Sequence, residues 1–173
     1  EHSLRGASPL GGDAQRGDAS PQLGLFRTEQ INYTTDDYYT PRWIFDTMGV
    51  EFDLDVACPP FGSVNVPARR YYTQADDGLI QPWNGRVWMN PPYSKPSPWV
   101  EKWIQHSNGI ALLPATGGKW ASTLWESKAK TVRLGRIAFV RNGKETKGTS
   151  FNSMIWAIGN ENIEAISKLG LVR

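Results

Sequence analysis

Four consecutive residues, Asn90, Pro91, Pro92 and Tyr93, follow a short apolar run in the stretch VWMNPPY. The Asn90 carboxamide supplies one carbonyl acceptor. The backbone carbonyl of Pro91 supplies a second, held rigidly because consecutive prolines restrict φ and have no N–H. The Tyr93 ring offers a face on which a flat heterocycle can stack. Together these groups could bind an aromatic ring that carries a planar amine, with two acceptors for the amine and a face for the ring.

This arrangement favours chemistry on an exocyclic amine, such as that of adenine or cytosine. The lone pair of such an amine is conjugated into the ring. Two acceptors, one for each N–H, favour a pyramidal nitrogen and stabilise the positive charge that grows as it attacks a methyl group. A methylsulfonium is a suitable donor because its leaving group departs neutral. The same tetrapeptide is also compatible with a rigid exit from a strand that buries its tyrosine.

The composition is that of a globular domain and limits the other functions available. The chain has 173 residues, of which 39% are hydrophobic and 21% charged, and a net charge of +2. One cysteine excludes an internal disulfide framework, and two distant histidines argue against a metal site. The longest apolar run is too short to span a bilayer, and no secretory signal is visible, so a cytoplasmic setting is expected. The mild positive charge is compatible with a polyanion partner or with an ordinary solvated surface.

The pattern along the chain predicts a flexible leader over residues 1–24, rich in Gly, Ser and Asp, and a single domain over residues 25–173. In YYTPRWIFDTMG we expect a short helix with Thr40 as its N-cap, Pro41 at the first helical position and Gly49 as its end. The alternating stretch EFDLDVAC predicts a strand that ends near Asp55.

Further strands are predicted at RRYYT, at GRVWMN and at GIALLPA, which is apolar on both faces. Helices are expected after a cap at Ser97, over about 120–130, and after a cap at Asn160 or Asn162. The pair Asn142-Gly143 predicts a hairpin with a basic loop. These elements indicate an open α/β sheet, mostly parallel with a C-terminal antiparallel hairpin, whose ligands bind at the carboxyl ends of the strands.

Six ordered blocks add specificity to the tetrapeptide: YYTPRWIFDTM, FDLDVAC, ARRYYTQADDGL, GRVWMNPPYSKPSPWVEKW, ALLPATGGKWAS and LGRIAFV. From about Tyr38 to Ala157 the chain resembles the phage-type DNA N6-adenine methyltransferases, the Dam-like family. The resemblance implies S-adenosylmethionine as cofactor, DNA as partner, a bacterial host cell, and a Rossmann-like methyltransferase sheet. Only 35 positions separate Asp55 from Asn90 (90 − 55), so we expect that sheet to be abridged.

The resemblance also implies roles for particular residues. Asn90, Pro91, Pro92 and Tyr93 match the catalytic loop of the family. The residues implied to contact the cofactor are Tyr39, Thr40, Pro41, Asp55, Ala57 and Asp77. Asp76 and Asp77 are equally compatible with an ordinary turn. No G-x-G follows the first strand, which leaves open the backbone cradle for the methionine part of the cofactor.

An adenine amine inside a duplex is out of reach, so we expect the base to be extruded and stacked on Tyr93. Trp120 is a candidate for the opposite wall of the pocket, while Trp88 is expected in the core. Contacts to DNA are predicted for Lys95, Lys119, Trp120, Arg136 and Arg141, whereas Lys144 and Lys147 can equally belong to a solvated loop. Other acceptors remain open: cytosine N4, adenine in RNA or a protein glutamine. A DNA-binding module without catalysis is the alternative outside the enzymes.

Overall fold

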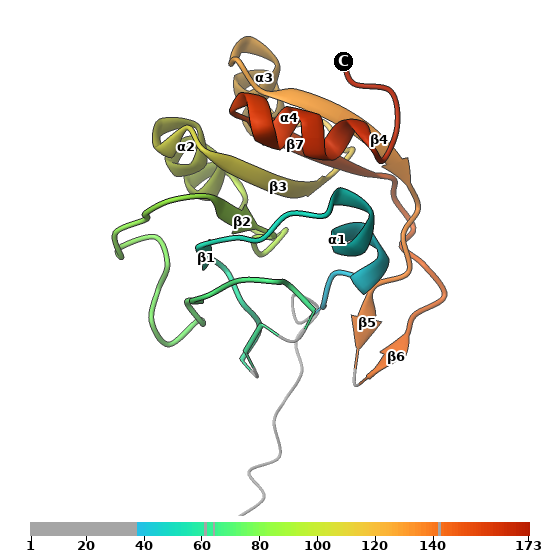
Figure 1. The fold of residues 1–173 in the computed structure, drawn as a ribbon, viewed down its shortest axis with the longest axis horizontal. Helices are drawn as coiled ribbons and strands as arrows, with labels where there is room; N and C mark the ends of the chain where they lie inside the picture. Colours follow the sequence, from blue (N-terminus) through green and yellow to red (C-terminus); the bar gives the residue numbers. More distant parts are fainter. Residues whose placement is uncertain (1–37, 61, 64, 142) are drawn as a thin grey trace, which may run out of the picture. The chain divides into compact units, whose positions relative to one another are not determined.

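The computed structural model describes residues 38–60, 62–63, 65–141 and 143–173, all of which fall within one compact unit. The predicted leader, residues 1–24, lies outside this part of the chain. Figure 1 shows how the helices and strands of this part are arranged. They are α1 (Arg42–Met48), β1 (Leu54–Asp55), β2 (Val87–Met89), α2 (Ser97–His106), β3 (Gly109–Pro114), α3 (Lys119–Glu126), β4 (Lys130–Gly135), β5 (Val140–Arg141), β6 (Lys144–Glu145), β7 (Ser153–Ile158) and α4 (Asn160–Ser167).

The main sheet is mixed and has five strands in the order β1-β2-β3-β7-β4. The β1–β2 and β2–β3 pairs are parallel, and β7 is antiparallel to both of its neighbours, β3 and β4. The prediction of an α/β fold is therefore confirmed, and the sheet that the structure shows is a mixed one. Four residues of β7, Ile155 to Ile158, are buried, which explains why this strand lies inside the sheet and not at its edge.

Two hydrophobic clusters cover the two faces of the sheet, because successive side chains of a strand point to opposite faces. Trp88, Ile110 and Leu112 face α1 and α4 in one cluster. Val87, Met89, Ala111 and Leu113 belong to the other cluster, with residues of α2 and α3. Figure 1 shows the same layering, with α1 and α4 on one face and α2 and α3 on the other.

The hairpin predicted around Asn142-Gly143 is confirmed as the antiparallel pair β5–β6. It is a separate two-stranded sheet and not an edge of the main one, which corrects the expectation that this hairpin completes the sheet. Its other neighbour is the segment before α1, since the backbones of Tyr39 and Val140 exchange two hydrogen bonds of 2.9 Å. The predicted strand RRYYT is only an irregular neighbour of β1, with bridges from Ala68 to Phe52 and from Tyr71 to Asp55.

Several predicted helix ends are wrong. The N-cap of α1 is Pro41 and not Thr40, because Pro41 is still extended, with φ −64° and ψ 141°. Pro96 precedes α2 in place of the predicted cap at Ser97. Gly159 precedes α4, and Asn162 is instead buried inside it. The helix expected over about 120–130 ends at Glu126, with Trp125 exposed.

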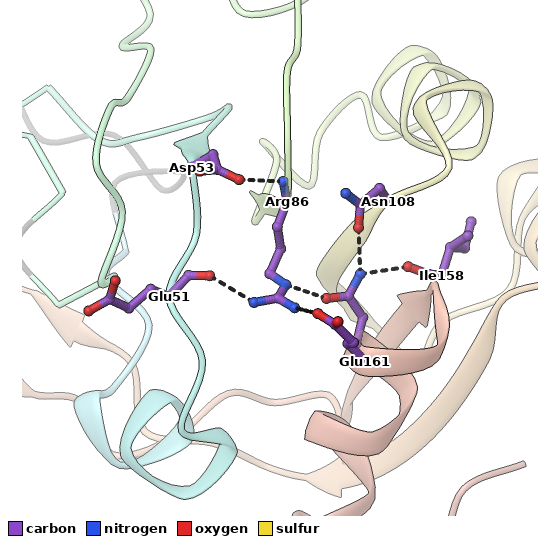
Figure 2. A network of polar contacts seen from close by, with 7 residues as sticks. Glu51, Asp53, Arg86, Asn108, Ile158 and Glu161 are labelled. Atoms are coloured by element: carbon purple, nitrogen blue, oxygen red, sulfur yellow. Dashed lines mark hydrogen bonds and ion pairs between the residues drawn. The ribbon is translucent and has the colours of Figure 1, made fainter.

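At the amino-terminal ends of β2 and β3, Arg86 joins several elements. Its guanidinium donates from Nε to the Asn162 carboxamide of α4 (2.7 Å) and also bonds to Glu161 and to the backbone carbonyl of Glu51, as Figure 2 shows. The Asn162 amide in turn donates to Asn108 (2.9 Å) and to Ile158 O (2.7 Å). This network, which we call the Arg86 brace, lies at the end of the sheet opposite Asn90.

Among the described residues, no helix is long and apolar enough to cross a membrane.

Candidate active site

Most of the residues predicted for catalysis and cofactor binding are brought together at the carboxyl ends of β1 and β2, whereas Pro41 and Asp77 lie outside the two cavities there. These strands are parallel, with Asp55 opposite Trp88, so Asp55 and Asn90 leave the sheet at the same edge. Trp88 itself is buried, as expected. Asn90 lines two cavities at this edge.

The larger cavity has a volume of about 500 Å³ and is mainly aromatic and hydroxylic. Asn90, Pro91, Tyr93 and Ser94 form one side of it. The other side comes from Tyr38 and from residues around the β5–β6 hairpin: Phe139, Thr146, Gly148, Thr149, Ser150 and Phe151. Its size falls within the range of about 300–1,000 Å³ that is typical of ligand pockets.

Tyr93 is surrounded by ring edges within this cavity. Its ring centroid lies 5.7 Å from that of Phe151 and 6.5 Å from that of Phe139, with interplanar angles of 70° and 75°. The Tyr93 hydroxyl is buried without a hydrogen-bond partner in the structure, and burial raises its pKa. The phenol therefore stays neutral, and its hydroxyl is a donor that a ligand can satisfy.

The smaller cavity, which we call the slot, also has Asn90 in its lining. It is lined by predicted cofactor residues (Tyr39, Thr40, Asp55 and Ala57) and by Tyr38, Pro59, Ser63, Asn65, Val66, Trp88 and Asn90. Its volume is about 10 Å³, which is roughly the space of one water molecule. Any larger ligand must therefore displace some of the side chains that line it.

Asp55 is the buried charge of this slot. Its carboxylate accepts hydrogen bonds from the Ser63 hydroxyl (3.1 Å) and from the backbone N–H of Ala57 (3.3 Å). Burial nevertheless dominates and raises the pKa of Asp55 to about 7, while these two hydrogen bonds lower it only in part. Burial and the neighbouring Asp55 charge also raise the pKa of the Cys58 thiol, which stays protonated.

Thr40 connects the slot to the loop that begins at Asn90. It is 3% exposed, and its hydroxyl oxygen lies 3.4 Å from the Asn90 amide nitrogen. The amide of Asn65 donates to the backbone carbonyl of Thr40 (3.0 Å). Pro41, in contrast, is buried at the start of α1 and lines neither cavity.

Asp77 lines neither of these two cavities. Its carboxylate accepts from the backbone N–H of Leu79 (3.2 Å), as the turn interpretation requires. The following Gly78 packs so close to the carbonyl of Val56 that a Cβ atom would lie 2.1 Å from that oxygen. The turn therefore lies beside the end of β1, and a role for Asp77 toward the adenosine part of a cofactor stays a prediction.

The residues predicted to contact DNA lie in three places. Lys95 follows the cavity residue Ser94 directly, and Arg141 stacks over Tyr38, with its guanidinium carbon 5.6 Å from the ring centroid. Lys119 and Trp120 begin α3, where Trp120 packs against the second hydrophobic cluster and not against either cavity. Arg136 is exposed just after β4. Contacts to DNA stay a prediction for all five.

Comparison of the sequence with known proteins identifies the family of this chain. The sequence profile of the DNA N-6-adenine-methyltransferase (Dam) family matches residues 27–168. The chain belongs to this DNA N-6-adenine-methyltransferase family.

Two phage relatives carry the same description, DNA N-6-adenine-methyltransferase. The protein of Haemophilus phage HP1 is 31% identical over 126 residues, which are 64% of this chain and 71% of the relative. The protein of Escherichia phage T1 is 31% identical over 135 residues, which are 61% of this chain and 54% of the relative. The chain thus spans about half the length of the T1 protein.

Several residues that line the two cavities of this DNA N-6-adenine-methyltransferase family member were not predicted from the sequence. Phe139 and Phe151 flank Tyr93, while Ser63 and Asn65 bond to Asp55 and Thr40. The only sequence signal for the two phenylalanines is an aromatic residue on each side of a hairpin. Ser63 and Asn65 lie in a stretch with ordinary loop composition, CPPFGSVNVP, which carries no such signal.

Proposed function

We propose that the protein transfers the methyl group of S-adenosylmethionine to N6 of an adenine that is extruded from duplex DNA. The observation that supports this most is that Asn90 lines both an aromatic cavity large enough for a base and the slot that contains the buried carboxylate of Asp55. A methyl donor on one side and an acceptor amine on the other would meet at this side chain.

The chemistry of the slot fits the methionine end of the cofactor. A carboxylate with a pKa near 7, buried and bonded to two donors among the described residues, gains most from a cationic partner such as an ammonium group. Asp55 would hold that group, and Tyr39, Thr40 and Ala57 would line its surroundings. When bound, the cofactor supplies a methyl group on a sulfonium sulfur, which leaves as a neutral thioether.

The larger cavity would hold the extruded base. Tyr93 would stack on the purine while the edges of Phe139 and Phe151 confine it, because edge-to-face contacts suit aromatic rings. The extrusion costs a few kcal/mol, which stacking against these rings offsets.

Asn90 and Pro91 would accept the two N6 hydrogens. The Pro92 carbonyl already accepts from the backbone N–H of Lys95 (3.3 Å), which leaves the carbonyl of Pro91, a cavity residue, as the second acceptor. Both acceptors stabilise the positive charge on N6 during attack, and the excess proton then passes to water. No base needs to remove a proton beforehand.

The remaining parts of the proposal concern fold and setting. The five-stranded sheet is taken as an abridged Rossmann-like methyltransferase sheet, supported by three adjacent parallel strands with Asp55 and Asn90 at their carboxyl ends. Residues 25–173 are taken as one methyltransferase domain. Since both relatives come from phages of bacteria, we place the reaction on DNA in a bacterial cytoplasm, with a phage or prophage as the source.

Incubation of the protein with isotope-labelled S-adenosylmethionine and duplex DNA, followed by mass spectrometry of the nucleosides, tests the proposal. We expect the label in N6-methyladenine. Asn90→Ala should lower the rate by about 10²–10³-fold, as loss of one transition-state contact typically does. Asn84→Ala, at an exposed position, is the matched control and should keep the rate.

Label in N4-methylcytosine, or in no nucleoside, would contradict the choice of acceptor. An Asn90→Ala variant as active as the control would contradict the assignment of the catalytic loop.

A further inference from the structure

The hydroxyl of Thr40 faces the catalytic carboxamide and not the helix that follows it. A threonine before a proline at a helix start ordinarily caps that helix, yet the structure shows no side-chain cap on α1. The Thr40 hydroxyl oxygen lies instead 3.4 Å from Nδ2 of Asn90, fifty residues further along the chain.

The backbone of Thr40 is held in place independently of Asn90. On one side, Tyr39 exchanges two backbone hydrogen bonds with Val140 of β5, each 2.9 Å long. On the other, Pro41 restricts the chain with its fixed φ of −64°, and the Asn65 amide donates to the Thr40 carbonyl at 3.0 Å. Thr40 thus presents its hydroxyl from a constrained position, which is what a group that orients a neighbour requires.

The orientation of the Asn90 carboxamide decides whether it can act. Its oxygen only accepts and its nitrogen only donates, so the two ends are not interchangeable. An amine with two N–H groups needs the oxygen, whereas the reversed carboxamide would set N–H against N–H. With Nδ2 directed at Thr40, Oδ1 lies on the other arm of the carboxamide. Asn90 itself lines the aromatic cavity as well as the slot.

We propose that Thr40 is a positioning residue, whose hydroxyl accepts from Nδ2 of Asn90 and so keeps Oδ1 available to the substrate amine. This inference rests on the proposed function of Asn90 and assigns Thr40 a role other than a contact to the cofactor. The contact is long in the free protein and would shorten in the complex with substrate, as hydrogen bonds in active sites often do.

The test compares three substitutions at Thr40 by single-turnover methyl transfer, by calorimetric S-adenosylmethionine binding and by thermal unfolding. Thr40→Val keeps the shape but loses the hydroxyl, and we expect the rate to fall about tenfold because a partly buried donor loses its acceptor. Cofactor affinity should change less than threefold. Thr40→Ser keeps the hydroxyl and should keep the rate within about twofold.

Thr40→Ala and Thr40→Ser differ only in the hydroxyl, so this pair carries the test if the valine variant does not fold. Thr47→Val makes the same exchange at an exposed helix position and should leave the rate unchanged. A valine variant with the wild-type rate would overturn the inference. So would a loss of cofactor affinity as large as the loss of rate, because Thr40 would then be a cofactor ligand.

A second measurement repeats the Thr40→Val exchange in the Asn90→Asp background. A carboxylate has an acceptor at both ends and needs no orientation. The valine exchange should therefore cost less than threefold there, and an equal tenfold loss in both backgrounds would overturn the inference. Failure of the proposed function looks different, since the wild-type protein itself would then leave adenine in DNA unmethylated.

Discussion

Asp55 shows how burial and function oppose each other at a single residue. The carboxylate is 2% exposed, and burial raises its pKa to about 7 despite the hydrogen bonds that it accepts from the Ser63 hydroxyl and the Ala57 N–H. A cationic ligand would supply the interaction that the free protein lacks. Under the proposed function, Asp55 lowers the stability of the free protein and gains a cationic partner when the cofactor binds.

The raised pKa makes a prediction about stability against pH. The folded protein binds the Asp55 proton up to about pH 7, whereas the unfolded chain releases it near 3.8, so stability falls as pH rises through this window. We expect Asp55→Asn to remove that loss. Urea unfolding should find the variant up to about 4 kcal/mol more stable than wild type at pH 8, relative to their difference at pH 4.

Wild type and Asp55→Asn should also differ in cofactor binding, since the variant lacks the negative charge. If their unfolding free energies ran parallel from pH 4 to 8, the carboxylate would not be buried as described.

At the scale of elements, the β5–β6 hairpin connects the two cavities. Its first strand bonds to Tyr39, which lines the slot, and the flanking Phe139 lines the aromatic cavity. The loop after it carries Lys147 between Thr146 and Gly148, which both line the aromatic cavity. Lys144 is in β6, and both lysines are exposed. A duplex whose base occupies the cavity would pass close to these charges.

Removal of the two lysine charges of the hairpin is expected to weaken DNA binding only through the loss of contacts to phosphates. The double substitution Lys144→Gln and Lys147→Gln should lower the slope of log Kd against log salt by about 1.8, at about 0.9 for each lost phosphate contact. The rate at saturating DNA should stay within about threefold.

The same double exchange at Lys128 and Lys130, exposed residues at the start of β4, is the control. Fluorescence anisotropy of labelled duplex at several salt concentrations measures both. A slope that changes equally in both pairs would assign the effect to net charge and not to the hairpin.

For the whole molecule, the Arg86 brace joins elements that are far apart in the sequence. Through Asn162, Glu161 and the backbone of Glu51, it connects β2 to α4 and to the segment before β1 (Figure 2). The ion pair with Glu161 contributes little by itself because that glutamate is largely exposed. The bond to the buried Asn162 matters more, because its loss leaves a polar group unsatisfied inside the protein.

Arg86→Ala is therefore expected to lower the free energy of unfolding by about 2–3 kcal/mol, because the Asn162 oxygen loses its donor. The brace lies at the end of the sheet away from Asn90, so the methyl-transfer rate per folded molecule should not change. Arg133→Ala, at an exposed position of β4, should stay within about 0.5 kcal/mol in the same urea titration. A variant of Arg86 with normal stability but impaired catalysis would show that the network serves the site.

The sequence by itself determined the parts that depend on local rules. Neighbouring residues predict the strand β3, the Asn142-Gly143 hairpin and the loop from Asn90 to Tyr93. The periodicity of apolar residues and the backbone restrictions of proline and glycine both act over only a few positions. The edge at which Asp55 and Asn90 meet was also predictable, since parallel strands end on the same side.

The tertiary structure alone decided which distant side chains face one another. Phe151 meets Tyr93, Thr40 turns from its expected helix cap to Asn90, and β7 enters the sheet between β3 and β4. No local rule selects these partners, because each contact joins segments tens of residues apart. Their proximity follows from how both faces of the sheet are covered by helices, which is a property of the whole fold.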